Sequence, residues 1–305
     1  MLKLFRFPYF LFLLSASIAS CTVFDPPTVI PAYGHIDSIH FTTYYDTQGT
    51  ASATIPAAWV YLDDNPVGAF QIPCTFPMIG NNGVHNIKIY SGISAADANS
   101  AYNINPFYQF YSFNVTLQQG VITKFHPTST YYHWVVFKLM EDFESPSEVS
   151  GGKPLHIIGF HGGGLASAST TTYMTVVNSP KSDVFQGGHS GRVVVTHNNH
   201  YFIGITDPAD SLPHNGSTPV YLEANYKCTT FLGVGMFERD TLVGPISPVV
   251  LSATSTWKKM YVDLNTTIQA WQAYPNYRVY FSMQLDSVDG HTTDTLLLDN
   301  IKIIY

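Results

Sequence analysis

Apolar and polar residues alternate along most of the chain. Runs over 36–41, 58–62 and 84–90 place an apolar side chain at nearly every second position, which is the period of a strand with one buried face. Clusters of Asp, Asn, Pro and Gly at 63–66 and 80–83 are typical of turns between such strands. No period of 3.6 residues is sustained beyond about two helical turns. The pattern predicts an all-β protein.

A Pro-rich tether and a change in composition divide the chain into two predicted domains. Residues 21–33 form the tether, and residues 34–138 form the first domain, which ends after a strand-like run at 131–137. Residues 139–305 form the second domain. A chain of 305 residues is long enough for two buried cores. We expect each domain to be a β-sandwich, in which two sheets pack face to face.

The first domain contains two segments that carry a family resemblance. They run from Trp59 to Gly68 and from Gly83 to Ile87. Together they resemble the PEGA-like small β-sandwiches of surface lipoproteins, which read strand, turn, Gly and then a Gly-x-His strand. The usual turn glycine is replaced in this sequence by Asp64-Asn65. The resemblance implies a spacer or interaction module without catalysis.

The second domain contains six segments in a recognisable order. They run from Asp142 to Ser145, Gly188 to Val195, Tyr221 to Lys227, Trp257 to Leu264, Tyr277 to Phe281 and Leu298 to Ile303. In this order they resemble the jelly-roll sandwiches of the carbohydrate-binding-module and galactose-binding-like type. The chain as a whole resembles surface lipoproteins of the Bacteroidetes kind. The resemblance implies a C-terminal jelly roll.

The first 20 residues predict an export signal. Lys3 and Arg6 supply positive charge, and the apolar run that follows is too short to span a bilayer. The segment 18–21 resembles the bacterial lipobox, which implies cleavage before Cys21 and diacylation of its sulfur. Two or three acyl chains hold a protein on a membrane essentially permanently, and we expect the outer membrane of the bacterial cell envelope. The alternative is an ordinary cleaved signal with a cysteine nearby.

Charge and cysteine content exclude several classes of protein. Only 11% of residues are charged and the net charge is -7, so we expect no basic surface and no nucleic-acid partner. Aromatic residues make up 14% of the chain, which suits half-buried strands. Cys74 and Cys228 lie in different domains and outside any Cys/His cluster, which excludes a structural zinc site at either cysteine. They form one bridge or remain two buried thiols.

Two glycine-rich segments match fragments of hydrolase motifs. The segment from His161 to Gly164 matches the oxyanion loop of some lipases, and Ser190 lies between two glycines in a nucleophile-like setting. A nucleophile elbow needs a glycine two residues after the serine and then a helix, whereas Arg192 and a β-branched run follow Ser190. We therefore expect no catalytic residue, no catalytic cofactor and a protein that is not an enzyme.

Two carboxylates lie near the start and the end of the second domain, Glu144 and Asp299. In jelly rolls of the type that this domain resembles, a calcium ion often lies where the first and last strands meet, held by carboxylate and carbonyl oxygens. The resemblance therefore implies Glu144 and Asp299 as ligands of a structural calcium ion. The alternative is that these carboxylates cap strand ends or pair with Lys302.

Alternation within three strands of the second domain predicts a polar and aromatic surface. In each strand one set of alternate residues is apolar and suits the core, so the intervening set points outward. If the strands are neighbours, the outward set forms one surface: Tyr221, Glu223, Asn225, Tyr261, Arg278 and Tyr280. Such groups suit a sugar, whose C–H face stacks on aromatic rings. The alternative is that this face has no function or packs on the other domain.

These observations predict a non-catalytic, lipid-anchored protein whose jelly roll binds carbohydrate or another surface polymer. The alternative is a structural or adhesive component of a surface assembly, which uses the same face to bind protein. In both cases the lipid on Cys21 attaches the protein to the membrane, and the second domain binds the other partner.

Overall fold

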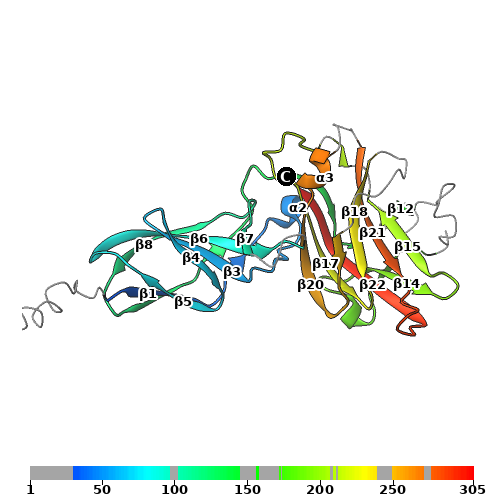
Figure 1. Cartoon of the computed structure of the whole chain (residues 1–305), viewed down its shortest axis with the longest axis horizontal. Helices are drawn as coiled ribbons and strands as arrows, with labels where there is room; N and C mark the ends of the chain where they lie inside the picture. Colours follow the sequence, from blue (N-terminus) through cyan, green and yellow to red (C-terminus); the bar gives the residue numbers. More distant parts are fainter. Residues whose placement is uncertain are drawn as a thin grey trace, which may run out of the picture.

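The protein consists of two β units that lie side by side in a computed structural model (Figure 1). The structure describes residues 30–96, 102–144, 156–157, 172, 174–206, 209–210, 212–238, 249–270 and 276–305. Strands dominate both units, so the predicted all-β class with two β-sandwich domains is confirmed.

The first unit is a small sandwich. Its elements are β1 (Ala32–Ile36), β2 (His40–Phe41), α2 (Tyr45–Gln48), β3 (Ala57–Leu62), β4 (Asn65–Gln71), β5 (Cys74–Met78), β6 (Gly83–Ser94), β7 (Tyr102–Ile104), β8 (Tyr111–Leu117), β9 (Ile122–Phe125) and β10 (Thr128–Ser129). One sheet has the order β4-β3-β6-β7, with β8 also paired to β6, and it faces the sheet β5-β1-β9. A third, short sheet joins β2 to β10. Val60, Phe76 and Ile87 are among the apolar side chains that form the core.

The turn between β3 and β4 shows how local sequence sets a strand pairing. Asp63 and Asp64 both have positive φ, 49° and 64°, which is the backbone of a two-residue turn whose twist matches a hairpin. Asp tolerates this conformation better than most residues. A turn is therefore confirmed here, but it is limited to residues 63–64, because Asn65 and Pro66 already belong to β4.

Two predicted strands have different limits in the structure. The run 36–41 is divided between β1 and β2, because Phe41 pairs with Ser129 in a separate sheet. In the run 131–137 only Phe137 belongs to a strand, β11 (Phe137–Glu141), which pairs with the last strand of the second unit. The chain passes from the first unit to the second within this run, which limits the strand there.

The second unit consists of two antiparallel sheets. Its elements are β11 (Phe137–Glu141), β12 (His156–Ile157), β13 (Thr175–Val177), η3 (Lys181–Asp183), β14 (Ser190–Thr196), β15 (Tyr201–Ile205), β16 (Ala209–Asp210), β17 (Tyr221–Cys228), β18 (Leu232–Glu238), β19 (Val249–Leu251), β20 (Thr254–Asp263), α3 (Asn265–Ala270), β21 (Asn276–Gln284) and β22 (Thr293–Ile304). We call β13-β14-β22-β17-β20 with β11 the docking sheet. The sheet β12-β15-β21-β18-β19 with β16 is the distal sheet.

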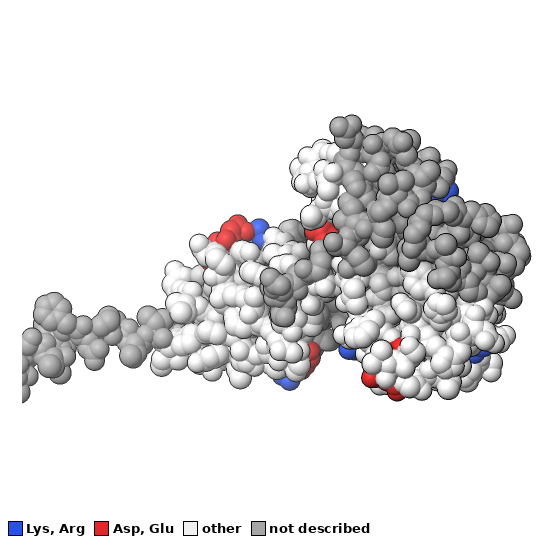
Figure 2. Space-filling view, turned by 45° about the vertical axis from the view of Figure 1, so that its right-hand side comes forward, with Lys and Arg blue, Asp and Glu red and all other residues white. Residues whose placement is uncertain are grey.

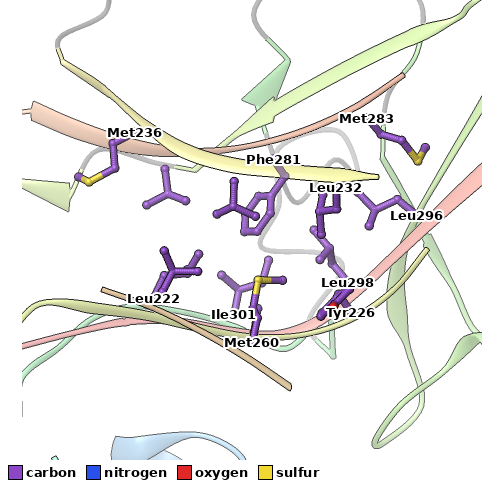
Figure 3. Packing of buried hydrophobic residues seen from close by; sticks show 14 of the residues in the cluster. Leu222, Tyr226, Leu232, Met236, Met260, Phe281, Met283, Leu296, Leu298 and Ile301 are labelled. Atoms are coloured by element: carbon purple, nitrogen blue, oxygen red, sulfur yellow. The ribbon is translucent and has the colours of Figure 1, made fainter. Parts of the chain in front are cut away.

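The chain alternates between these sheets, from β14 to β15, from β17 to β18, and from β20 through β21 to β22. Alternation of this kind, with antiparallel pairing throughout the described ladders, is the topology of a jelly roll. Apolar side chains fill the space between the sheets, with Leu232, Met236 and Phe281 facing Leu222 and Ile301 (Figure 3). The predicted jelly roll is confirmed.

A bulge in β22 keeps its apolar residues in the core. Leu298 and Ile301 both face the core although they are three positions apart. Asn300 has a φ of 50° and the pairing with β17 shifts register at this point, so one extra residue restores the alternation. Asp299 and Lys302 consequently lie on the outer face of the docking sheet.

Charged side chains are sparse on the face drawn in Figure 2, as the composition predicts. Within the described residues, Cys74 and Cys228 are free thiols, and burial raises the pKa of the Cys228 thiol to about 11. None of the helices in the described part of the chain is both long and apolar enough to cross a membrane.

The first unit packs end-on against the docking sheet (Figure 1). Phe41, Tyr108 and Tyr131 of the first unit form one apolar cluster with Tyr261 and Ile304 of the second. The backbone joins them as well, since the Ala96 N–H donates to the Tyr261 carbonyl at 2.8 Å. The two cores are thus linked by a third, interfacial core.

Candidate functional site

The predicted assignment of strand faces is confirmed, but the predicted exposure of one face is wrong. Leu222 and Ala224 point into the core, as do Met260 and Val262. The opposite set on β17 and β20, which includes Tyr221, Glu223, Asn225 and Tyr261, is buried, and Glu223 has no exposed area. The first unit covers this face, as the alternative interpretation anticipated.

Glu223 lies at the centre of the contact between the units. Its carboxylate accepts hydrogen bonds from the hydroxyls of Tyr131 at 2.8 Å and Tyr108 at 3.2 Å, both from the first unit. Lys259 on the neighbouring strand forms an ion pair with the same carboxylate at 3.4 Å, and both side chains are fully buried. A single carboxylate therefore joins two partners across the interface and one on its own sheet.

Further polar contacts surround this centre. Asn225 accepts a hydrogen bond from the Ser52 hydroxyl at 2.5 Å, and the Tyr261 hydroxyl accepts one from the Thr54 N–H at 3.0 Å. The Lys302 ammonium donates to the Thr50 carbonyl at 2.7 Å. The segment 50–54 thus lies along the docking sheet and satisfies polar groups that would otherwise be buried without partners.

Burial governs the protonation of these groups. It raises the pKa of the Tyr108 and Tyr131 hydroxyls well above the ordinary value, so both keep the protons that they donate to Glu223. Burial lowers the pKa of the Lys259 amine and lowers that of Lys302 to about 7. The interface therefore holds one carboxylate and two amines of weakened basicity.

The structure does not bring Arg278 and Tyr280 to the other predicted binding residues. Both are on β21 in the distal sheet, where Tyr280 is buried in a cluster with Ile203 and Ile205. A Cβ at Gly235 would lie 2.6 Å from the Tyr280 ring, so a glycine is needed beside it. The prediction of one six-residue surface is wrong because β21 crosses to the opposite sheet.

Glu144 and Asp299 hold the same loop. Glu144 Oε1 accepts hydrogen bonds from the N–H groups of Gly188 and His189 at 2.8 and 3.0 Å. Asp299 Oδ2 accepts them from the Ser190 hydroxyl at 2.8 Å and the Gln186 N–H at 3.2 Å. The start and end of the jelly roll therefore meet at residues 186–190.

The donors at this loop supply positive partial charge to both carboxylates. Burial raises the pKa of the Asp299 carboxyl to about 6, and the nearby Glu144 carboxylate contributes in the same direction. Close carboxylates suit a divalent cation, but among the described residues no third His, Cys, Asp or Glu completes a metal-binding group. Calcium binding by this pair stays a prediction.

Ser190 occupies a structural position. Its hydroxyl donates to Asp299 and accepts the Phe185 N–H at 3.3 Å, and the residue is completely buried. The ring of the adjacent His189 faces Glu144 instead. This arrangement fits a turn entering a strand, while the segment 161–164 lies outside the described residues, as does Cys21.

An open pocket of about 520 Å³ lies at one end of the jelly roll. It is formed by the loop between β17 and β18 and the loop between β21 and β22, and its lining residues are Thr230, Phe231, Gln284, Leu285, Asp286, Val288 and Asp289. Phe231 is 59% exposed, which is unusual for an aromatic ring of this size. The pocket therefore combines an accessible ring with an amide and carboxylates.

A buried carboxylate organises this pocket. Asp294 accepts hydrogen bonds from the Thr229 hydroxyl at 2.7 Å and the Asp286 N–H at 2.8 Å, and it pairs with His291 Nδ1 at 2.7 Å. It therefore ties together both loops that line the pocket. Two-residue alternation does not reveal this site, because its residues lie in loops. The available signal was Phe231, an aromatic residue directly after two threonines in a short connection.

No family model matches the chain, and no curated protein matches it. Solved structures that it matches include a carbohydrate-binding module in complex with β-1,4-galactotriose (13% identity, 53% of this chain and 97% of that chain, TM-score 0.31). A family 11 carbohydrate-binding module of a Clostridium thermocellum cellulosomal cellulase matches at 12% identity (44% and 81%, TM-score 0.29). An exo-β-agarase matches at 11% (56% and 25%, TM-score 0.34). Similarities at these TM-scores carry no inference about ligand or activity.

Replacing Glu223 with Ala is expected to lower the free energy of unfolding by about 3–5 kcal/mol, because Lys259 then stays buried without its counter-ion. Urea unfolding followed by fluorescence measures the change. The matched control is Asp64→Ala, which breaks an exposed ion pair with Lys88 and should leave stability close to wild type. Equal, small changes in both variants would contradict a buried network at the interface.

Lys302 is expected to make stability rise with pH. Its pKa of about 7 in the folded protein lies below the ordinary 10.5, so between these values the unfolded chain binds more protons and alkali favours folding. Relative to Lys302→Met, the wild type should therefore gain stability from pH 7.5 to 9, with a slope of at most about 1.4 kcal/mol per pH unit. Parallel pH profiles of unfolding for the two proteins would refute this.

The calcium prediction is tested by thermal unfolding. Millimolar calcium at neutral pH is expected to raise the melting temperature of the wild type, because a ligand that binds only the folded state stabilises it. Glu144→Gln removes one charged ligand and should abolish the rise. A wild-type melting temperature that does not respond to calcium, with magnesium as the comparison ion, would rule the site out.

Proposed function

We propose that this chain is a non-catalytic, lipid-anchored protein of the bacterial cell envelope that binds carbohydrate through the loop pocket of its jelly roll. The observation that carries the proposal is the exposed Phe231 ring beside Gln284, Asp286 and Asp289 in an open pocket. Of the residues first expected to bind, those on β17 and β20 are buried against the first unit, and Arg278 and Tyr280 lie on the opposite sheet. The proposal therefore keeps the function and assigns it to another surface.

The chemistry of the pocket suits a neutral sugar. A sugar ring can stack its C–H face on Phe231 while its hydroxyls donate to the carboxylates and accept from the Gln284 amide. Among the described residues that line the pocket there is no Lys or Arg, which disfavours a phosphorylated or acidic ligand. A volume of about 520 Å³ lies within the usual range for small ligands, so one or two sugar rings would be held.

The pocket is organised before any ligand arrives. Asp294 holds both loops, and Thr229 reinforces it with a hydrogen bond between its hydroxyl and the Thr295 N–H at 2.9 Å. A loop that is already fixed loses less conformational entropy on binding. Weak individual contacts to a sugar can therefore add up to a useful affinity.

The alternative is a structural or adhesive protein that binds other proteins of a surface assembly. A specific surface, the outer face of β3 and β6, favours this alternative. The rings of Tyr61 and Tyr90 pack edge to face there, with their centroids 5.4 Å apart. The centroids of the Tyr90 and Phe110 rings are 4.9 Å apart. Half-buried tyrosines of this kind are enriched at protein interfaces. Under this alternative the first unit, and not the jelly roll, would hold the partner.

Phe231→Ala is expected to weaken retention on a polysaccharide affinity gel by about tenfold, since the loss of one stacking ring costs about 1–1.5 kcal/mol. The matched control is Phe113→Ala, which removes a similarly exposed ring from the first unit and should leave retention unchanged. Mature wild-type protein is run against a panel of neutral polysaccharides.

Three outcomes separate the hypotheses. Loss of retention only in Phe231→Ala supports the pocket. Retention that persists in Phe231→Ala but falls in Tyr90→Ala moves binding to the first unit and contradicts the proposal. Failure of the wild type to be retained by any polysaccharide removes the carbohydrate function and leaves the structural alternative.

A further inference from the structure

The first unit carries exposed aliphatic side chains at the end that is remote from the jelly roll. Ile79 and Val84 are 72% and 71% exposed, and Ile30, Val121 and Ile122 are exposed as well. Single exposed aliphatic residues are common on proteins, but a group of this kind at one place indicates a contact surface. We call these five residues the aliphatic tip.

Strand pairing brings the members of the tip together. Ala32 pairs with Met78, which places Ile30 near Ile79. The Gly120 N–H donates to the Pro31 carbonyl at 3.0 Å, so the loop that carries Val121 lies beside the same residues. Val84 opposite Thr116 completes the end of the sandwich.

The tip lies far from the contact between the units. β6 has 12 residues, which span about 40 Å at the usual rise of a strand. Its far end leads to Ala96, which bonds to Tyr261 of the jelly roll, whereas its near end begins at Gly83 in the tip. The tip is therefore the free end of the molecule, opposite the docked end (Figure 1).

The segments that build the tip contain no charged residue. No Asp, Glu, Lys or Arg occurs in 30–36, 76–87 or 111–123. Behind the aliphatic residues lie aromatic rings, with Tyr111 and Phe113 stacked at 6.3 Å. The neighbouring turn brings Asp63 to His85, next to Val84, so charged groups border the aliphatic residues. An aliphatic patch bordered by aromatic and polar side chains suits the boundary between lipid tails and headgroups.

The chain that leads to the tip identifies its occupant. Ile30 lies nine residues after Cys21, and nine extended residues reach at most about 30 Å. This step rests on the proposed lipid attachment at Cys21. With that attachment, the tip is confined close to the bilayer, and its effective concentration there is high enough for weak contacts to form.

We infer that the aliphatic tip lies in the headgroup region of the bilayer to which the chain is anchored, and that this contact holds the first unit upright on the membrane. The lipid anchor alone would leave the protein free to tilt on its tether. A second, shallow contact restricts that freedom and directs the jelly roll away from the surface.

The test compares lipidated full-length protein on phosphatidylethanolamine and phosphatidylglycerol vesicles with the same protein in detergent-free solution as Cys21→Ser. Flotation reports anchoring, and hydrogen–deuterium exchange of 79–84 and 118–122 reports tip contact. The wild type is expected to float and to show at least threefold slower exchange in these segments on vesicles. Ile79→Asp/Val84→Asp should float equally without the slowing, and Val250→Asp, which changes a 59% exposed residue of the jelly roll, should behave as wild type.

Each of the other outcomes contradicts a specific part of the inference. Flotation with exchange that is equal on vesicles and in solution overturns the tip contact and leaves the anchor intact. Failure of the wild type to float overturns the anchor and the tip contact with it. If exchange is slow without vesicles and becomes slower still as the protein concentration rises, the tip pairs with a second copy. This result also overturns the inference.

Discussion

The buried carboxylate of Glu223 is the constraint on which the arrangement of the two units depends. A carboxylate at the centre of a sheet face needs partners: Tyr108 and Tyr131 donate hydrogen bonds to it, and Lys259 forms an ion pair with it. Both hydrogen-bond donors come from the first unit, so separation of the units would expose the carboxylate and both tyrosine hydroxyls to water. Because the polar contacts have specific directions, they define one orientation of the units, which apolar packing alone would not do.

Because the two units pack through this face, other surfaces of the molecule are left to bind external partners. The outer face of β17 and of the second half of β20 is used within the chain, so external ligands are left with other surfaces, which include the loop ends and the first unit. The loop pocket at Phe231 and the aliphatic tip at Ile79 lie on different units and are held by unrelated contacts. Because the two units are joined by the packed interface, the orientation of the tip on a surface also affects the orientation of the pocket.

Much of the fold could be predicted because two-residue alternation is a local property. It correctly separated Leu222 from Glu223 and Val279 from Arg278, whereas the pairing of Glu144 with Asp299 was implied by the resemblance to jelly rolls. Alternation cannot say what covers a face or which sheet a strand joins, because both depend on pairings between distant segments. Tyr280 was therefore assigned to the wrong sheet. The pocket was missed because loop residues such as Phe231 have no period.

The most direct measurement is a double-mutant cycle with Tyr131→Phe, Glu223→Gln and the combined variant, each unfolded in urea. If the hydroxyl of the first unit donates to the carboxylate of the second, the two changes should couple by about 0.5–3 kcal/mol. Strict additivity of the two single changes would show that the units are not joined through Glu223, and the account of the interface would then be wrong.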